Sequence, residues 1–307
     1  MAHQFVTLSR DDESFAQYIQ GRFSRQLRAL PVHSFQPFSQ KEKVTFKIVD
    51  RRDLDCPHRT QLIWQTLRPA YLSLTLSPLL VVTWMVFLAS RGVLSRNWIG
   101  ELTAISEVNW VHGILAAGSL LALHFAAFLW NDYFDHLNGS DRINPERGSQ
   151  VIQKGWVPAY QIRLWAWFQL SLACALAAPL LWNQSWNLWL LSTIVAFVIL
   201  SFSRVREKGL KEKGLGDLLV FLFLGPLLTG FFASILLGQL HWLWFLLGLI
   251  FGGLAMLTYQ LRQFEGFTRQ VDSRSRSLVT RLGFDRAKTF LFLETSVIAL
   301  GGSVVLF

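Results

Sequence analysis

Long apolar runs separated by short polar segments dominate the chain after residue 68. An α-helix needs roughly 20 apolar residues to cross a bilayer. Runs near that length occur at about 69–89, 109–130, 159–182, 185–203, 216–237, 241–260 and 287–306. The pattern therefore predicts an all-α chain, with a multi-pass transmembrane helical bundle of about seven spans over residues 69–307.

Composition agrees with this pattern. Hydrophobic residues make up 52% of the 307 residues and charged residues only 16%, which excludes an ordinary soluble domain. The formal net charge of +9 is explained by where the charges lie, so no nucleic-acid partner is expected.

The basic residues predict the topology. If the N-terminus is cytoplasmic, all 29 Lys and Arg residues except Arg91 and Arg96 fall on the cytoplasmic side of the predicted spans. We therefore expect a multi-pass integral membrane protein with its N-terminus and its aspartate-rich segment in the cytoplasm and its C-terminus on the opposite side.

Residues 1–68 form a polar, basic segment that we expect to be a cytoplasmic N-terminal extension, partly amphipathic. In the stretch 13–30, Phe15, Ile19 and Phe23 lie near one face of a helix, with arginines beside or opposite them. The stretch suggests a helix on the anionic membrane surface. A partly disordered basic tail and a segment that docks on a partner explain it equally well.

The sequence NDYFDHLNGSD, residues 131–141, places three aspartates at the end of an apolar run. Asp132 and Asp135 share a helical face if the helix continues through them, and Asp141 can fold back after the Asn138-Gly139 turn. Carboxylates are the ligands that Mg²⁺ prefers, often together with substrate phosphates. The alternative is that these acids only end a span and pair with Arg142 or Arg147.

Two further segments fit a diphosphate site in an apolar bundle. The basic loop RVREKGLKEKG, residues 204–214, can bind phosphate oxygens, although such cations are also ordinary determinants of topology. The stretch GLGDLLVFLFLGPLLTGFF, residues 214–232, has glycines and Pro226 that permit close helix contact or a broken backbone, with or without a function.

Taken in order, these segments resemble the UbiA superfamily of intramembrane prenyltransferases, nearest to its 1,4-dihydroxy-2-naphthoate branch. The resemblance runs from about residue 64 to the C-terminus. The segments that carry it are WQTLRPAYLSLTLSPLL (64–80), NDYFDHLNGSD (131–141), GSQVIQKGWV (148–157), GLGDLLVFLFLGPLLTG (214–230) and RSLVTRLG (276–283).

The resemblance implies an enzyme that transfers a polyprenyl group from its diphosphate to a small aromatic quinone precursor within the membrane, with Mg²⁺ as cofactor. By motif, Asp132 and Asp135 would be catalytic and would bind metal together with Asp141. The substrate-binding candidates are Asn131, Arg68, Lys211, Lys213 and Arg147.

The chain departs from the family pattern in its second aspartate motif. Gly266 and Gln270 occupy the positions of its two carboxylates, and Glu265 and Asp272 are the nearby acids that can form a weakened second metal site. The family bundle has nine helices, two more than the seven predicted here. The wall that these two helices form can be left open, closed by the N-terminal extension or supplied by a partner subunit. Two alternatives therefore stay open, a catalytically silent isoprenoid-binding or assembly subunit and a UbiA-type terpene cyclase.

Overall fold

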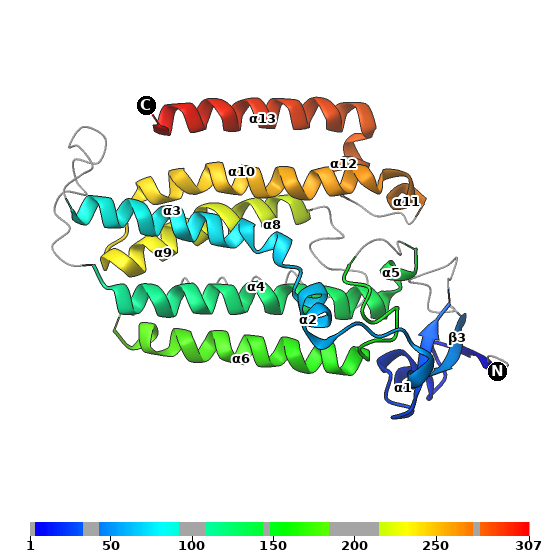
Figure 1. Cartoon of the computed structure of the whole chain (residues 1–307). Coiled ribbons are helices and arrows are strands. Elements are labelled where there is room, and N and C mark those ends of the chain that lie inside the picture. The colour runs from blue at the N-terminus through cyan, green and yellow to red at the C-terminus, as the bar shows by residue number, and fades with distance from the viewer. Residues whose placement is uncertain are drawn as a thin grey trace. The chain divides into compact units, whose positions relative to one another are not determined.

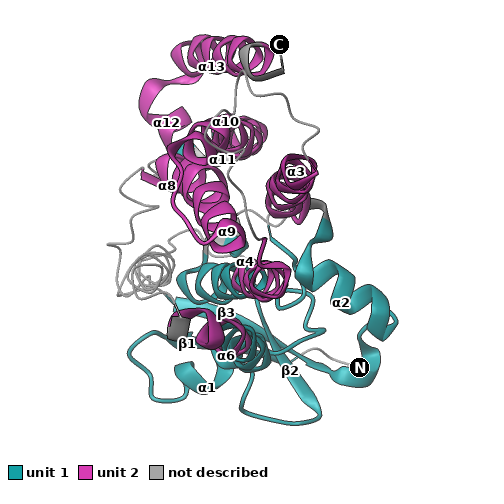
Figure 2. Cartoon of the chain, turned by 90° about the vertical axis from the view of Figure 1, so that its left-hand side faces the viewer, with its two compact units in different colours: residues 1–70, 125–170, 268–275 teal, residues 71–124, 171–267, 276–307 magenta. Residues whose placement is uncertain are grey.

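The structure is a computed structural model that describes residues 4–32, 43–91, 108–143, 148–183, 215–272 and 277–306 (Figure 1). The chain divides into two compact units (Figure 2). Unit 1 comprises Met1–Ala70, Phe125–Leu170 and Thr268–Ser275, and unit 2 comprises Tyr71–His124, Ser171–Phe267 and Arg276–Phe307.

The predicted apolar runs are helices wherever the structure describes them. Among the described residues, five stretches are long and apolar enough to cross a membrane: α3 (Ser73–Ser90), α4 (Trp110–Asn138), α6 (Ala159–Asn183), the continuous stretch α8 to α9 (Gly216–Leu237) and α10 (Trp242–Glu265). Helix α13 (Phe284–Leu306) covers the predicted run 287–306. The run 185–203 lies outside the described residues, so the total of seven spans stays a prediction.

Short elements precede or connect these long helices. They are η1 (Arg51–Asp53), α2 (Arg59–Leu67), η2 (Pro69–Tyr71), α5 (Ser140–Ile143), α11 (Phe267–Asp272) and α12 (Leu278–Leu282).

The N-terminal extension contains a sheet, so the prediction of an all-α chain was wrong for this part. Strands β1 (Gln4–Ser9) and β2 (Leu27–Pro31) pair antiparallel with the central strand β3 (Lys43–Asp50), in the order β1-β3-β2. In β3, Val44 and Phe46 alternate with polar residues and are fully buried, as expected of a strand with one face on a core.

The prediction of a surface helix over residues 13–30 is also wrong, because the helix is much shorter. Helix α1 covers only Phe15–Gln20 and ends at Gly21, which has φ 70°. Its apolar residues Phe15 and Ile19 are buried with Val44 and Phe46 of the sheet. The hydrophobic face that suggested membrane contact therefore belongs to the core of the extension's own small fold.

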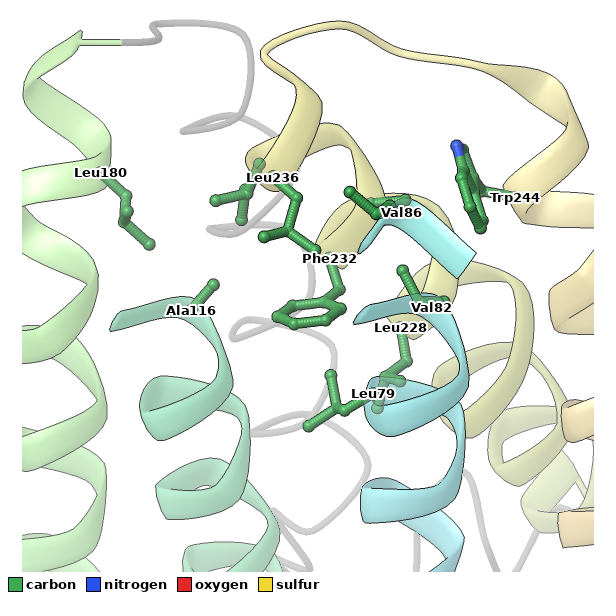
Figure 3. Close-up of a cluster of buried hydrophobic side chains, with 11 residues drawn as sticks. Leu79, Val82, Val86, Ala116, Leu180, Leu228, Phe232, Leu236 and Trp244 are labelled. Carbon is green, nitrogen blue, oxygen red and sulfur yellow. The ribbon is translucent and has the colours of Figure 1, made fainter. Parts of the chain in front are cut away.

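Unit 2 has an apolar core built by several long helices. Phe232 of α9 lies among Leu79 and Val82 of α3 and Leu228 one turn before it (Figure 3). Because lipid tails are as apolar as these side chains, close van der Waals packing rather than removal from water stabilises this core.

Helices α8 and α9 are joined by a π-helical segment, η5 (Phe223–Leu227), that packs directly on α10. Gly225 has φ −118° and ψ −109°, and Pro226 removes a backbone donor, so the helix is locally broken. A Cβ on Gly248 of α10 would collide with the backbone of Pro226 and with Thr229. The glycines thus permit both the close contact and the broken backbone that the sequence suggested.

We expect Gly248→Ala to lower the thermal stability of the protein in lipid, because the added methyl group must displace the backbone of η5. Overpacking of this kind costs about 1–3 kcal/mol. The control is Gly301→Ala in α13, where an added Cβ meets nothing within 4 Å. That variant should be as stable as the wild type or more stable, since alanine favours helix by about 1 kcal/mol. Equal unfolding temperatures for the two variants would contradict the tight crossing.

Candidate functional site

Helix α4 continues through the aspartate-rich segment and ends at Asn138. Asp132 and Asp135 are therefore three residues apart on one helix, as predicted, and they lie in its last two turns. The C-terminal end of a helix carries partial negative charge, which attracts cations. Two carboxylates added there make this end of α4 a strong site for positive charge.

Asp132 is almost fully buried, with 2% of its surface exposed, and forms an ion pair with Arg68 through Oδ1. The side-chain hydroxyl of Ser149 lies close to the same carboxylate. A buried carboxylate is stable only when it is paired or neutralised. The predicted substrate-binding residue Arg68 and the predicted metal ligand Asp132 are thus direct partners.

The backbone holds Arg68 in place. Arg68 ends α2 with φ 48°, a left-handed conformation that is uncommon for a non-glycine residue, and its N–H donates to the Trp64 carbonyl at 3.1 Å. Its guanidinium also lies over the Phe128 ring, 5.6 Å from the centroid. Pro69 follows at once, so the turn that directs the side chain towards α4 is stiff.

Asp141 folds back beside Asp132, as the Asn138-Gly139 turn predicted. Gly139 has φ 82° and separates α4 from α5, where Asp141 is 4% exposed and accepts a hydrogen bond from Gln153 Nε2 at 2.6 Å. Arg142 Nη1 donates to the His136 carbonyl at 3.4 Å. Arg147 lies outside the described residues, so the alternative in which these acids pair with Arg142 or Arg147 stays open.

Gly148 marks the space that these groups share. A Cβ placed on Gly148 would lie 3.5 Å from Oδ1 of both Asp132 and Asp141 and 3.2 Å from Arg68 Nη2. Gly148 also has φ 80°, which an L side chain rarely adopts. The glycine therefore leaves open a small space bordered by two carboxylates and a guanidinium, which we call the carboxylate site.

Asp135 belongs to the same helix end but is only half buried. It accepts a hydrogen bond from Asn131 Nδ2 at 2.8 Å. Asn131 thus orients the carboxylate of Asp135, a role that the motif alone did not distinguish from direct substrate binding.

A hydrophobic anchor holds the loop that supplies Gly148 and Gln153. Val151, Ile152 and Val157 are buried together with Leu129 and Tyr133 of α4. The Val157 N–H donates to the Val151 carbonyl at 3.2 Å, which closes the loop on itself. The apolar residues of GSQVIQKGWV therefore fix the position of its polar residues against the aspartates.

The donor set suits a hard divalent cation, because every candidate ligand is a carboxylate oxygen. Within the ranges described, no three His, Cys, Asp or Glu side chains converge closely enough to hold a metal ion by themselves. Mg²⁺ commonly uses one or two protein carboxylates and completes its shell with water and phosphate oxygens. Asp132 and Asp141, which border the same space beside Gly148, fit that pattern.

Other predicted residues are placed in part. Glu265 is the exposed last residue of α10 and Asp272 ends α11. Arg147, Lys211 and Lys213 lie outside the residues that the structure describes.

Sequence reasoning missed a third buried acid, Asp217, which lies within the quoted stretch GLGD. Asp217 is 4% exposed and accepts hydrogen bonds from Gln263 Nε2 at 2.9 Å and from the Leu278 N–H at 3.3 Å. It therefore joins α8 to α10 and to the start of α12. Its position in the first turn of an otherwise apolar helix was the signal that could have identified it.

Comparison with solved structures supports this fold. The structure of a UbiA homolog from Archaeoglobus fulgidus bound to GPP and Mg²⁺ matches with a TM-score of 0.53 at 16% sequence identity, covering 80% of this chain and 77% of that one. A comparison with curated protein sequences gave no match.

A family model described as the UbiA prenyltransferase family matches residues 78–307, three quarters of the chain. Together with the apolar helices, this match makes the protein a multi-pass integral membrane protein. The chain belongs to the UbiA prenyltransferase family.

Proposed function

We propose that the protein transfers a polyprenyl group from its diphosphate to a small aromatic quinone precursor, with Mg²⁺ bound at the carboxylate site. The observation that carries this proposal is the convergence of Asp132, Asp141 and Arg68 on the space beside Gly148. Acids bind the cation and the guanidinium binds phosphate oxygens, so the site matches a metal diphosphate. The family match and a relative described as bound to GPP and Mg²⁺ support the same substrate class.

Asp132, Asp135 and Asp141 would hold Mg²⁺, which neutralises the negative charge that develops on a diphosphate leaving group. Arg68 already balances the charge of Asp132, and its planar guanidinium is suited to bidentate contact with phosphate oxygens. Because Asp132 is buried, its interactions are stronger there than in water.

The rest of the proposed site completes the binding of the diphosphate. Lys211, Lys213 and Arg147 supply further positive charge, while Glu265 and Asp272 form a weakened second metal site. We place the N-terminus and the carboxylate site in the cytoplasm and the C-terminus on the opposite side, and we assign the aromatic acceptor to the 1,4-dihydroxy-2-naphthoate type.

A second candidate function, that of a catalytically silent subunit, is favoured by the loss of both carboxylates from the second aspartate motif. Gly266 and Gln270 stand where the family has carboxylates, which fits an isoprenoid-binding or assembly subunit with no activity of its own that works beside a partner. A terpene cyclase, in which the allylic cation is quenched within the prenyl chain, is the third possibility. Activity measurements separate these three.

Diphosphate release by the purified protein in lipid tests the proposal. With Mg²⁺ and a panel of polyprenyl diphosphates, we expect release that depends on added 1,4-dihydroxy-2-naphthoate. Asp132→Asn should reduce the rate about 10²-fold or more, because it removes charge at the centre of the site. Release without the acceptor would indicate a cyclase, and no release from a folded protein would indicate the silent subunit.

Gly148→Ala tests the shared space directly. We expect binding of Mg²⁺ and pyrophosphate to weaken at least about tenfold, because the methyl group enters the space between the carboxylates and because alanine at this φ costs about 1 kcal/mol.

The control is Gly238→Ala, at an exposed left-handed position with φ 68° at the end of α9. It imposes similar backbone strain in unit 2 and should leave pyrophosphate binding unchanged. Unchanged binding in Gly148→Ala, measured by isothermal titration calorimetry, would contradict the assignment.

A further inference from the structure

The extension carries a folded module that lies outside the part of the chain matched by the family model, residues 78–307. This N-terminal module consists of residues 4–32 and 43–54, with the three-stranded sheet and α1. It belongs to the same compact unit as the carboxylate site. The question is what the module does there.

The first link runs through His136 of α4. Its side chain is 1% exposed, and Nε2 lies 2.8 Å from the main-chain carbonyl oxygen of Ile19 in α1. Since a carbonyl only accepts, Nε2 carries the hydrogen and donates. His136 follows Asp132 by four residues, so it lies on the same side of α4. The module is therefore bonded to the helical face that presents Asp132.

A second link is made at the end of the helix. The last carbonyls of α4 have no partners within the helix. Arg10 of the module donates from Nη2 to the Leu137 carbonyl at 3.4 Å. The positive charge of Arg10 also suits the negative end of the helix dipole.

A third link joins the module to the loop and helix that follow the site. A Cβ on Gly155 would lie 2.6 Å from Leu30, and a Cβ on Gly21 would lie 2.8 Å from Pro158. Arg22 lies over the ring of Tyr160, 5.6 Å from its centroid. Between the two surfaces there remains a cavity of about 10 Å³, the room of about one water molecule. The module therefore packs closely on the end of the loop that follows the site and on the start of α6.

We propose that the N-terminal module is a clamp that sets the position of the carboxylate site, and that His136 is its main positioning residue. The module bonds to α4 between Asp132 and Asp141 and packs on the loop that supplies Gly148 and Gln153. Metal and diphosphate binding depend on the spacing of these groups to within about 1 Å. The inference rests on the proposed function only in the measurement of diphosphate binding. The measurement of hydrogen exchange is independent of it.

The test uses the full chain in lipid nanodiscs and compares His136→Leu with His136→Gln. The glutamine Nε2 can donate to the Ile19 carbonyl, whereas leucine fills the space without a donor. The control is Thr7→Val, which removes a hydrogen bond to Thr45 between β1 and β3 but touches no group of the site.

Hydrogen exchange is measured without any ligand. In His136→Leu we expect exchange of the amides in 15–21 and 133–138 to rise about tenfold or more, while His136→Gln and Thr7→Val resemble the wild type. In the wild type, these two segments should open together as denaturant is added. If they open independently, or if His136→Leu leaves their exchange unchanged, the clamp is overturned.

Binding of geranyl diphosphate with Mg²⁺ is measured on the same samples. We expect about tenfold weaker binding in His136→Leu and restored binding in His136→Gln. Faster exchange in His136→Leu with unchanged diphosphate binding would overturn the positioning role. If the wild type does not bind the diphosphate, the proposed function is contradicted. The hydrogen-exchange result, which needs no ligand, still tests whether the module holds α4 in position.

Discussion

The buried pair of Asp132 and Arg68 is the interaction on which the rest of the site depends. A carboxylate with 2% of its surface exposed, at the end of a long apolar helix, must be neutralised. Removing one partner from such a pair typically costs about 3–5 kcal/mol. Three features of the chain therefore surround this carboxylate. They are the left-handed turn at Arg68, the glycine at position 148 and the loop that is anchored by buried apolar residues.

The same pair sets the charge balance of the proposed site. Arg68 supplies a positive charge that compensates Asp132. Under the proposed function, a divalent cation bound with a diphosphate would compensate the carboxylate as well and would leave the guanidinium for phosphate oxygens. A buried acid in an apolar bundle needs such compensation.

Much of the architecture could be predicted, because long apolar runs and clustered acids are local signals. Each described long helix coincides with a predicted run, and the fold-back of Asp141 follows from the Asn138-Gly139 turn. The sheet was missed because β1 pairs with β3 across about 40 residues, and such pairing has no local signature beyond the alternation in KVTFKIVD.

The partners of individual side chains could not be predicted for the same reason. Arg68 and Asp132 are 64 residues apart, and His136 and Ile19 are 117 apart. Helical amphipathicity at Phe15 and Ile19 suggested a membrane surface, yet the apolar face is covered by a sheet formed later in the chain. A hydrophobic face in a sequence indicates that the face is buried. It does not indicate whether lipid or another part of the chain buries it.

The most direct test of the account is electron paramagnetic resonance of Mn²⁺, used in place of Mg²⁺, with the full chain in nanodiscs. We predict that geranyl diphosphate increases the amount of bound Mn²⁺ and that Asp132→Asn abolishes this increase in a protein that remains folded. Equal Mn²⁺ binding by Asp132→Asn and the wild type in the presence of the diphosphate would contradict the carboxylate site as the place where metal and diphosphate meet.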